Sequence, residues 1–286
     1  MKILNTFKPV LVCAFFMFSI ISFSQDTVPE KYTSSKKGKF FISWGGNREA
    51  YSKSDITFTG ENYNFTIHDA TAHDKPKGWH IDYIDPTRFT VPQTNFKIGY
   101  FISDHYSVSF GLDHMKYVMH QKSRRLEGFI NLPNDELGSI YNGEYNHDLF
   151  LVSQDFLQFE HTDGLNYICL EFARVDDISA IFHIENTDKI QVNFTEGIGG
   201  GILYPKTNTA LLQKDRYDAF HLAGYGVSIN AGLNLTFFKH FFIEADLKGG
   251  YIDMPDIRTT MNTADSASQH FFYLQRILSV GGIFRI

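Results

Sequence analysis

Apolar and polar side chains alternate along two consecutive segments between Phe220 and Asp253. One face of the first segment is apolar, and its residues are Ala223, Tyr225, Val227, Ile229, Ala231, Leu233, Leu235 and Phe237. The other face carries only glycine, serine, asparagine and threonine. A period of two indicates a β-strand with one face in an apolar environment. The second segment follows a turn of Lys239 and His240, so the two are predicted to form an antiparallel hairpin.

Segments of this kind, rich in aromatic and β-branched residues, recur along the chain with turn signals between them. They predict eight strands, near 38–48, 92–103, 105–119, 156–174, 188–204, 219–237, 240–253 and 268–286. Tight turns alternate with longer connections, of which 49–91 and 120–155 are examples. This alternation is typical of a transmembrane β-barrel, whose turns are short on one side of the membrane and long on the other. Several strands exceed the ~9–11 residues that cross a bilayer and are expected to project beyond it.

The start of the chain indicates export. Lys2 and Lys8 precede the apolar run 10–21, and Ser22 and Ser24 supply small residues where a signal peptidase reads them. We therefore predict a signal peptide over 1–24, a polar periplasmic leader over 25–37 and a barrel domain over 38–286. The apolar run is too short to span a bilayer as a helix, and no later stretch is long enough.

Charge and cysteine content narrow the function classes. Removal of 1–24 takes away two lysines and no acidic residue, so the net charge moves from −6 to −8. An acidic chain is a poor partner for nucleic acid, and we expect none. Cys169 is the only cysteine left after cleavage, which excludes an intramolecular disulfide. Stability must then come from burial and backbone pairing.

The last segment, LQRILSVGGIFRI, is predicted to run as a strand to Ile286, with Leu278, Val280 and Phe284 on one face. With the signal peptide and the eight strands, the chain resembles a small bacterial outer-membrane β-barrel protein of the porin-like superfamily. The resemblance implies an all-β, eight-stranded antiparallel up-and-down barrel with long external loops, in the outer membrane of a Gram-negative bacterium. It also implies contact with outer-membrane lipid and with the barrel assembly machinery. Family members commonly end in an aromatic residue, whereas this chain ends in Ile286.

In such a barrel the apolar faces meet lipid and the polar faces line the lumen. Strand parity then predicts a polar cluster in the lumen that consists of Lys97, Asp113, Glu171, Glu244, Asp246 and Lys248. With eight strands a lumen is just wide enough to be filled by side chains, so an open pore is not expected. Aromatic residues beside the tight turns are predicted to form an interfacial girdle, and they are Phe101, Tyr106, Phe237, Phe238, Phe241 and Phe242.

Two segments carry candidate chemistry. In FEHTDGLNYICLEF, from Phe159, the parity places His161 and Asp163 on one face, where they could form an acid/base pair. Barrel lipases carry a His-x-Ser on a strand, and HTD is similar only in the histidine, because Asp163 stands where the nucleophilic serine would be. In HDATAHDKPKGWH, the residues His68, His73 and His80 are metal-ligand candidates, but their spacing is not diagnostic, and a solvated loop is the favoured interpretation.

The sequence therefore predicts an outer-membrane protein, without cofactor, with a structural role or a role in binding an external ligand or protein through its loops. One alternative is an enzyme that modifies lipid at the outer leaflet with His161 and Asp163. A second alternative is a soluble lipocalin-like carrier, which would bury the apolar face around an apolar ligand.

Overall fold

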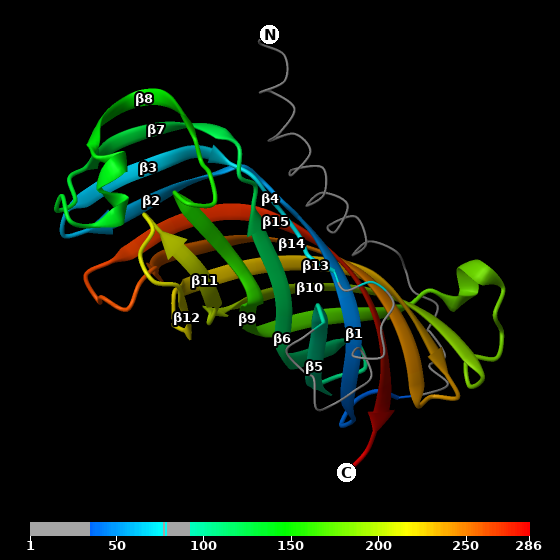
Figure 1. The fold of residues 1–286 in the computed structure, drawn as a ribbon. Coiled ribbons are helices and arrows are strands. Elements are labelled where there is room, and N and C mark those ends of the chain that lie inside the picture. Colours follow the sequence, from blue (N-terminus) through cyan, green and yellow to red (C-terminus); the bar gives the residue numbers. More distant parts are fainter. Residues whose placement is uncertain (1–34, 77, 79–91) are drawn as a thin grey trace, which may run out of the picture. The chain divides into compact units, whose positions relative to one another are not determined.

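Eight antiparallel strands form a closed ring in the computed structural model, which describes residues 35–76, 78 and 92–286 (Figure 1). The ring strands are β1 (Phe40–Tyr51), β5 (Thr94–Phe101), β6 (Tyr106–Met119), β9 (Leu157–Asp177), β10 (Ile190–Leu203), β13 (Gly224–Phe237), β14 (Phe241–Arg258) and β15 (Ser266–Phe284). Each pairs with the next in chain order, and β15 pairs with β1 from Phe40↔Phe284 to Tyr51↔Tyr273. The predicted fold class and all eight predicted strands are confirmed.

The predicted signal peptide, residues 1–24, and most of the leader lie outside the described residues. Within the described part of the chain, no helix is long and apolar enough to cross a membrane.

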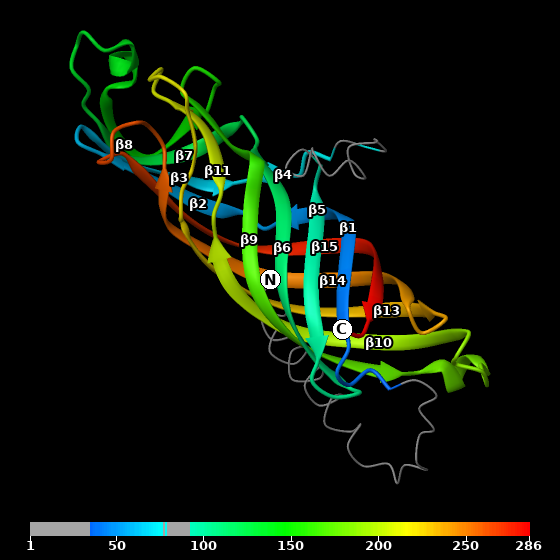
Figure 2. The same cartoon turned by 90° about the horizontal axis from the view of Figure 1, so that it is seen from below.

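The two ends of the ring differ. At one end, which we call the turn end, lie the connections 102–105, 178–189 and 238–240, the start of β1 and the end of β15 (Figure 2). The connection 178–189 contains the short 3-10 helix η4 (Ser179–Phe182). The other end, the loop end, holds the connections that follow β1, β6, β10 and β14. The predicted alternation of tight and long connections holds except for two connections, because 178–189 at the turn end is longer than 259–265 at the loop end.

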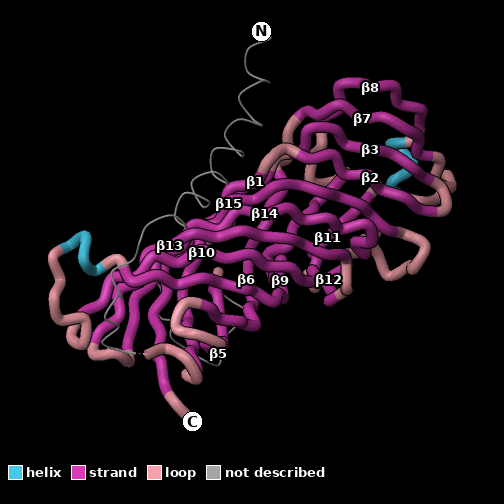
Figure 3. The backbone as a smooth tube through the Cα atoms, turned by 180° about the vertical axis from the view of Figure 1, so that it is seen from behind, coloured by secondary structure: helices cyan, strands magenta, loops and turns pink. Residues whose placement is uncertain are grey.

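The long connections are not plain loops, because they contain strands that the sequence did not predict. These are β2 (Ser54–Gly60), β3 (Tyr63–Ala70), β4 (Ala72–His73), β7 (Ser123–Ile130), β8 (Gly143–Leu151), β11 (Lys206–Leu211) and β12 (Tyr217–Phe220), with the 3-10 helix η3 (Leu137–Tyr141) between β7 and β8. Beyond the point where β1 ends, β2 takes the free edge of β15 at Ser266–Gln269. β3, β7 and β8 follow in that order, and we call these four strands the extension sheet (Figure 3).

An apolar core fills the loop end. The inner face of the extension sheet packs against β9 and its neighbours, as the ring contacts Phe58–Phe159 and Phe65–Phe156 show, with centroids 5.6 and 5.5 Å apart. On the other side of this core, β11 pairs with the first residues of β9. Each fully buried phenylalanine of this kind contributes about 1.5–3 kcal/mol relative to an exposed one. The sheet of the ring thus continues into the extension sheet, and an apolar core lies beneath it.

Candidate functional site

The outer face of the ring is apolar and its inner face is polar. On β13, Ile229 is 65 % exposed, whereas the next residue, Asn230, is 8 % exposed and faces the lumen. Other large apolar side chains that lie exposed on the ring are Val108, Phe110, Leu170, Phe172, Phe194, Ile198, Val227, Leu233, Leu247, Leu278 and Val280. Such a surface is costly in water and matches the hydrocarbon of a bilayer.

Charged side chains cross the lumen and pair with one another. The Lys248 ammonium lies 2.8 Å from the Asp113 carboxylate and 3.3 Å from that of Glu171. Lys97 lies 2.7 Å from the other Glu171 oxygen. Buried charges are tolerated when they are paired in this way. Four of the six side chains that the sequence places in the lumen therefore form one network.

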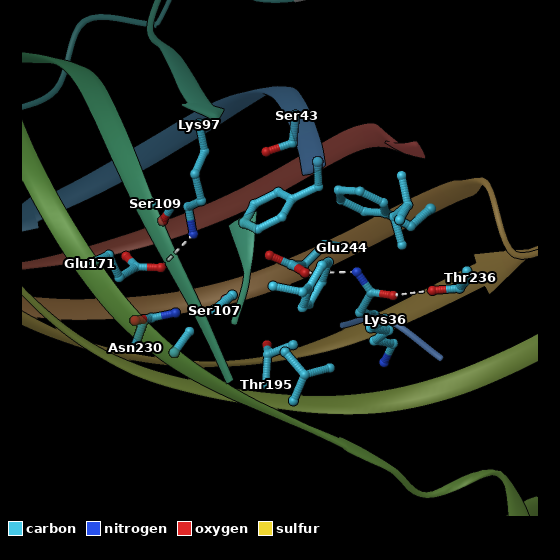
Figure 4. Close-up of a pocket in the computed structure, with 17 residues that line it drawn as sticks. Lys36, Ser43, Lys97, Ser107, Ser109, Glu171, Thr195, Asn230, Thr236 and Glu244 are labelled. Carbon is cyan, nitrogen blue, oxygen red and sulfur yellow. Dashed lines mark hydrogen bonds and ion pairs between the residues drawn. The ribbon is translucent and has the colours of Figure 1, made fainter. Parts of the chain in front are cut away.

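The other two predicted lumen residues, Glu244 and Asp246, lie nearer the turn end. The Asn234 amide donates to Glu244 at 2.8 Å, and the Thr195 hydroxyl lies 3.5 Å from an Asp246 oxygen. A cavity of about 40 Å³ lies in this part of the lumen, between Glu244, Thr195 and the Lys97–Glu171 pair (Figure 4). A cavity of this size holds only a few water molecules, since one water needs roughly 10–15 Å³.

Five apolar side chains close the lumen at the turn end. They are Phe41, Phe101, Val175, Phe242 and Ile283, all buried and each from a different part of the ring. We call this group the apolar plug. The girdle predicted from the sequence is therefore wrong at Phe101 and Phe242, because both rings point inward. Phe238 and Phe241 are exposed, as the prediction requires.

The last residues of the leader bind to the turn end, which the sequence did not predict. The Lys36 ammonium donates to Asn193 at 2.7 Å, inside the ring beside the plug. Asp104, in the β5–β6 turn, accepts the backbone N–H groups of Lys36 and Lys37 and the Ser35 hydroxyl. These hydrogen bonds, led by that from Lys37, lower the pKa of Asp104. The leader thus adds a second cover to this end of the lumen.

His161 and Asp163 are not brought together. The His161 ring is fully buried beside the rings of Phe159 and Tyr117, and its Nδ1 lies 2.9 Å from the Thr207 hydroxyl. Burial lowers the pKa of His161 to about 3. Asp163 is half exposed and pairs with Lys206 at 3.2 Å. A neutral histidine in an apolar core and a carboxylate held by a lysine do not form an oriented acid/base pair.

His161 and Asp163 face different directions because β9 contains an irregularity, which the alternation of residues in the sequence does not reveal. Met115↔Leu165 and Tyr117↔His161 are paired, so three residues of β9 lie opposite the single residue Lys116. One of the three, Gly164, has a φ of +132°, which favours glycine. The irregularity turns Asp163 away from the face that carries His161.

The two loop histidines that the structure describes, His68 and His73, have different partners. His73 stacks on His120, with ring centroids 4.6 Å apart, and His80 lies outside the described residues. His68 instead contacts Asp55 and Glu127 and stacks on His147. Burial lowers the pKa of His68, but the hydrogen bonds to the two carboxylates outweigh it, and the net shift is upward. Glu127 and His147 lie on strands that the sequence did not predict, so sequence reasoning missed both.

Comparison with known proteins gives no match to a protein-family model and none among curated proteins. Solved structures that are similar include Ail, the attachment invasion locus protein of Yersinia pestis, at 12 % identity over 87 % of this chain and 99 % of that chain, with a TM-score of 0.34. The outer membrane protein OprG from Pseudomonas aeruginosa matches at 9 % identity over 88 % and 98 %, with a TM-score of 0.39. The outer membrane protease OmpT from Escherichia coli matches at 5 % identity over 89 % and 99 %, with a TM-score of 0.32.

All three TM-scores lie below 0.5, so these similarities do not assign the protein to a class. We assign its class from the surfaces of the ring itself. A closed antiparallel ring leaves no unpaired strand edge in lipid, its outer face is apolar, and its lumen is polar and filled. These features define an integral β-barrel protein of the outer-membrane type. A closed ring with an apolar outer face is a form in which β-strands can cross a bilayer.

Proposed function

We propose that this protein is a non-conducting surface receptor, in which the barrel is a membrane anchor and the extension sheet binds an extended segment of a partner protein. The observation that carries this proposal is the open edge of β8 above a filled lumen. With the tight turns on the periplasmic side, as in other barrels of this type, the extension sheet lies outside the cell.

The filled lumen argues against a transport role. The apolar plug and Lys36 cover the turn end, the Lys97–Glu171–Lys248–Asp113 network crosses the middle, and the apolar core fills the loop end. Ions crossing this path would have to displace paired charges and buried aromatic side chains. The expected ion conductance is therefore negligible.

The edge of the extension sheet has the features of a strand-binding surface. Among the described strands, β8 pairs only with β7, so its outer edge offers unpaired backbone groups. Leu149 and Leu151 are 79 % and 63 % exposed on this strand. An added strand gains main-chain hydrogen bonds from such an edge, and alternate apolar side chains give it specificity.

The helix η3, which precedes β8 in the chain, carries two further exposed apolar side chains. Leu137 and Ile140 are both 72 % exposed, and η3 is held beside β8 by the ring contact Tyr141–Phe150 and by the hydrogen bond from the Tyr145 hydroxyl to the Tyr141 carbonyl. Large apolar side chains that lie exposed together on a protein surface often mark an interaction site. The partner segment is accordingly an extended peptide with apolar residues at alternate positions.

The test uses a phage-displayed peptide library and the full-length protein in detergent. Peptides selected on the wild type should carry alternating apolar residues and should bind at least tenfold more weakly to the double variant Leu149→Lys/Leu151→Lys. The control variant is Ile181→Lys, because Ile181 is as exposed but lies on η4 at the turn end.

Bound peptide should also slow hydrogen exchange at the β8 amides. Selection of no peptide, or equal binding to the wild type and the double variant, would contradict the receptor proposal. A steady ohmic current through the wild type in a planar bilayer, measured beside a porin as positive control, would contradict its non-conducting part.

A further inference from the structure

Four polar side chains form a row across the outer face of the extension sheet. Asp55 lies on β2, His68 on β3, Glu127 on β7 and His147 on β8. These strands are neighbours in the sheet, so each contributes one member of the row. The residues come from three separate parts of the sequence, and the strand pairing alone brings them together.

The row converges on one carboxylate oxygen. Glu127 Oε2 lies 3.0 Å from His68 Nε2 and 3.3 Å from His147 Nε2. The two imidazole rings are stacked nearly parallel, with centroids 4.8 Å apart and an angle of 9° between their planes. On the far side of His68, Nδ1 lies 2.9 Å from Asp55 Oδ2. One ligand atom each from His68, Glu127 and His147 lies within 4.8 Å of the other two.

Two strand irregularities create this geometry. The β2–β3 register shifts between Ser54 and Ile56, and Asp69, just after His68, has a φ of +54°. Its N–H donates to Asp55 at 2.9 Å and so holds the carboxylate that faces His68.

The second irregularity is in β8, where His147 has a φ of +58° and forms the bulge opposite β7. Its carbonyl accepts a hydrogen bond from Arg125. Non-glycine residues rarely adopt a positive φ, and bulges redirect side chains, often at functional sites. Here the bulge lies where His147 stacks on His68.

We propose that His68, Glu127 and His147 bind a divalent transition-metal ion, with zinc as the best-matched candidate. Two imidazole nitrogens and one carboxylate oxygen are a zinc ligand set that leaves a fourth position open. Tetrahedral zinc with ligands at 2.0–2.1 Å has ligand atoms about 3.3 Å apart, close to the separations from Glu127 Oε2.

Asp55 completes the site as a positioning residue. A metal-binding histidine usually donates its other ring N–H to a carboxylate, which fixes the ring and its tautomer. Asp55 faces Nδ1 of His68 in this way and leaves Nε2 for the ion. Glu127 and His147 are exposed, so an ion from the medium can reach the site and its fourth position can accept water or a ligand from a partner.

The experiment is calorimetric titration of the tag-free, full-length protein in detergent with zinc chloride. We expect one saturable site per chain. His147→Asn should weaken zinc binding at least tenfold, and asparagine was chosen because it tolerates a positive φ, so the bulge should be kept. Asp55→Asn should weaken it roughly 10–100-fold, as loss of a supporting carboxylate does.

The matched control is His105→Asn, which removes a histidine that pairs with the carboxylate of Asp176 at the turn end. It should leave zinc affinity unchanged. The shift of the folded barrel on an unboiled gel verifies that each variant is folded. Absence of a saturable site in the wild type, or a His147→Asn variant that binds zinc as the wild type does, would overturn the proposal.

Discussion

The Lys248 ammonium on β14 and the Asp113 carboxylate on β6 form an ion pair 2.8 Å long across the lumen. In the ring order, β6 is the third strand and β14 the seventh, so the pair joins opposite walls of the barrel. Both side chains are almost fully buried. This ion pair thus lies in the middle of the lumen and connects two strands that are not neighbours in the ring.

Loss of one partner of this pair should destabilise the barrel strongly. Lys248→Met leaves Asp113 buried without its cation and removes one of the two cations beside Glu171, which should lower the free energy of unfolding by about 3–5 kcal/mol. Urea unfolding in detergent, followed by tryptophan fluorescence, measures the change. Lys53→Met is the control, because Lys53 forms an exposed surface pair with Asp69. Equal unfolding midpoints for Lys248→Met and the wild type would refute a stabilising role of the network.

Lipid contact is tested by two arginine substitutions at equally exposed isoleucines. Ile229 lies on the outer face of β13, near the bilayer midplane in this account. Ile229→Arg should lower the stability of the barrel by about 2–4 kcal/mol and so reduce its assembly. Ile140→Arg, on η3 of the loop end, should have little effect, because Ile140 is 72 % exposed but lies outside the ring. Folded protein recovered from outer membranes is the measurement. Similar recovery of both variants would show that Ile229 does not face lipid.

The loop-end core should be sensitive to acid through His161. The pKa of His161 is lowered by burial to about 3, whereas an unfolded histidine titrates near 6.5. Between these values the unfolded chain binds a proton that the folded chain does not, so the free energy of unfolding falls as the pH falls. At pH 5 this amounts to about 2 kcal/mol.

His161→Gln removes the titrating group but keeps a side chain able to hydrogen-bond Thr207. The decrease in urea midpoint from pH 7.5 to pH 5 should therefore be smaller in this variant than in the wild type. All other titrating groups are common to the two proteins. An identical pH dependence would mean that His161 is solvated or already protonated in the folded chain.

The ring was predictable because lipid outside and a polar lumen inside impose an alternation of apolar and polar side chains on the ring strands. The same alternation is present in β2 and β3, where Ile56, Phe58, Phe65 and Ile67 face the core, but they lie in a connection that was interpreted as solvated. Tertiary packing, rather than lipid, makes these segments strands. To predict β2 and β3 as strands, one would need to know that the loop end contains an apolar core.

The side-chain arrangements at the loop end were less predictable than the lumen network, because each of them depends on a break in the alternation. Gly164 turns Asp163 away from His161, and the bulge at His147 brings that residue to His68. Glu127, which joins the two histidines, is 59 residues from His68 in the sequence, and only the β3–β7 register makes them neighbours. Residue spacing along one segment carries no information on such a cross-strand row.

The central claim is that a membrane barrel presents the extension sheet outside the cell, and protease accessibility tests it most directly. A protease cleavage tag inserted near Asn134, between β7 and η3, should be cut on intact cells. The same tag at Lys239, in the β13–β14 turn, should be cut only after the outer membrane is opened. Cleavage at Lys239 on intact cells, or protection of both sites until the membrane is opened, would contradict the account.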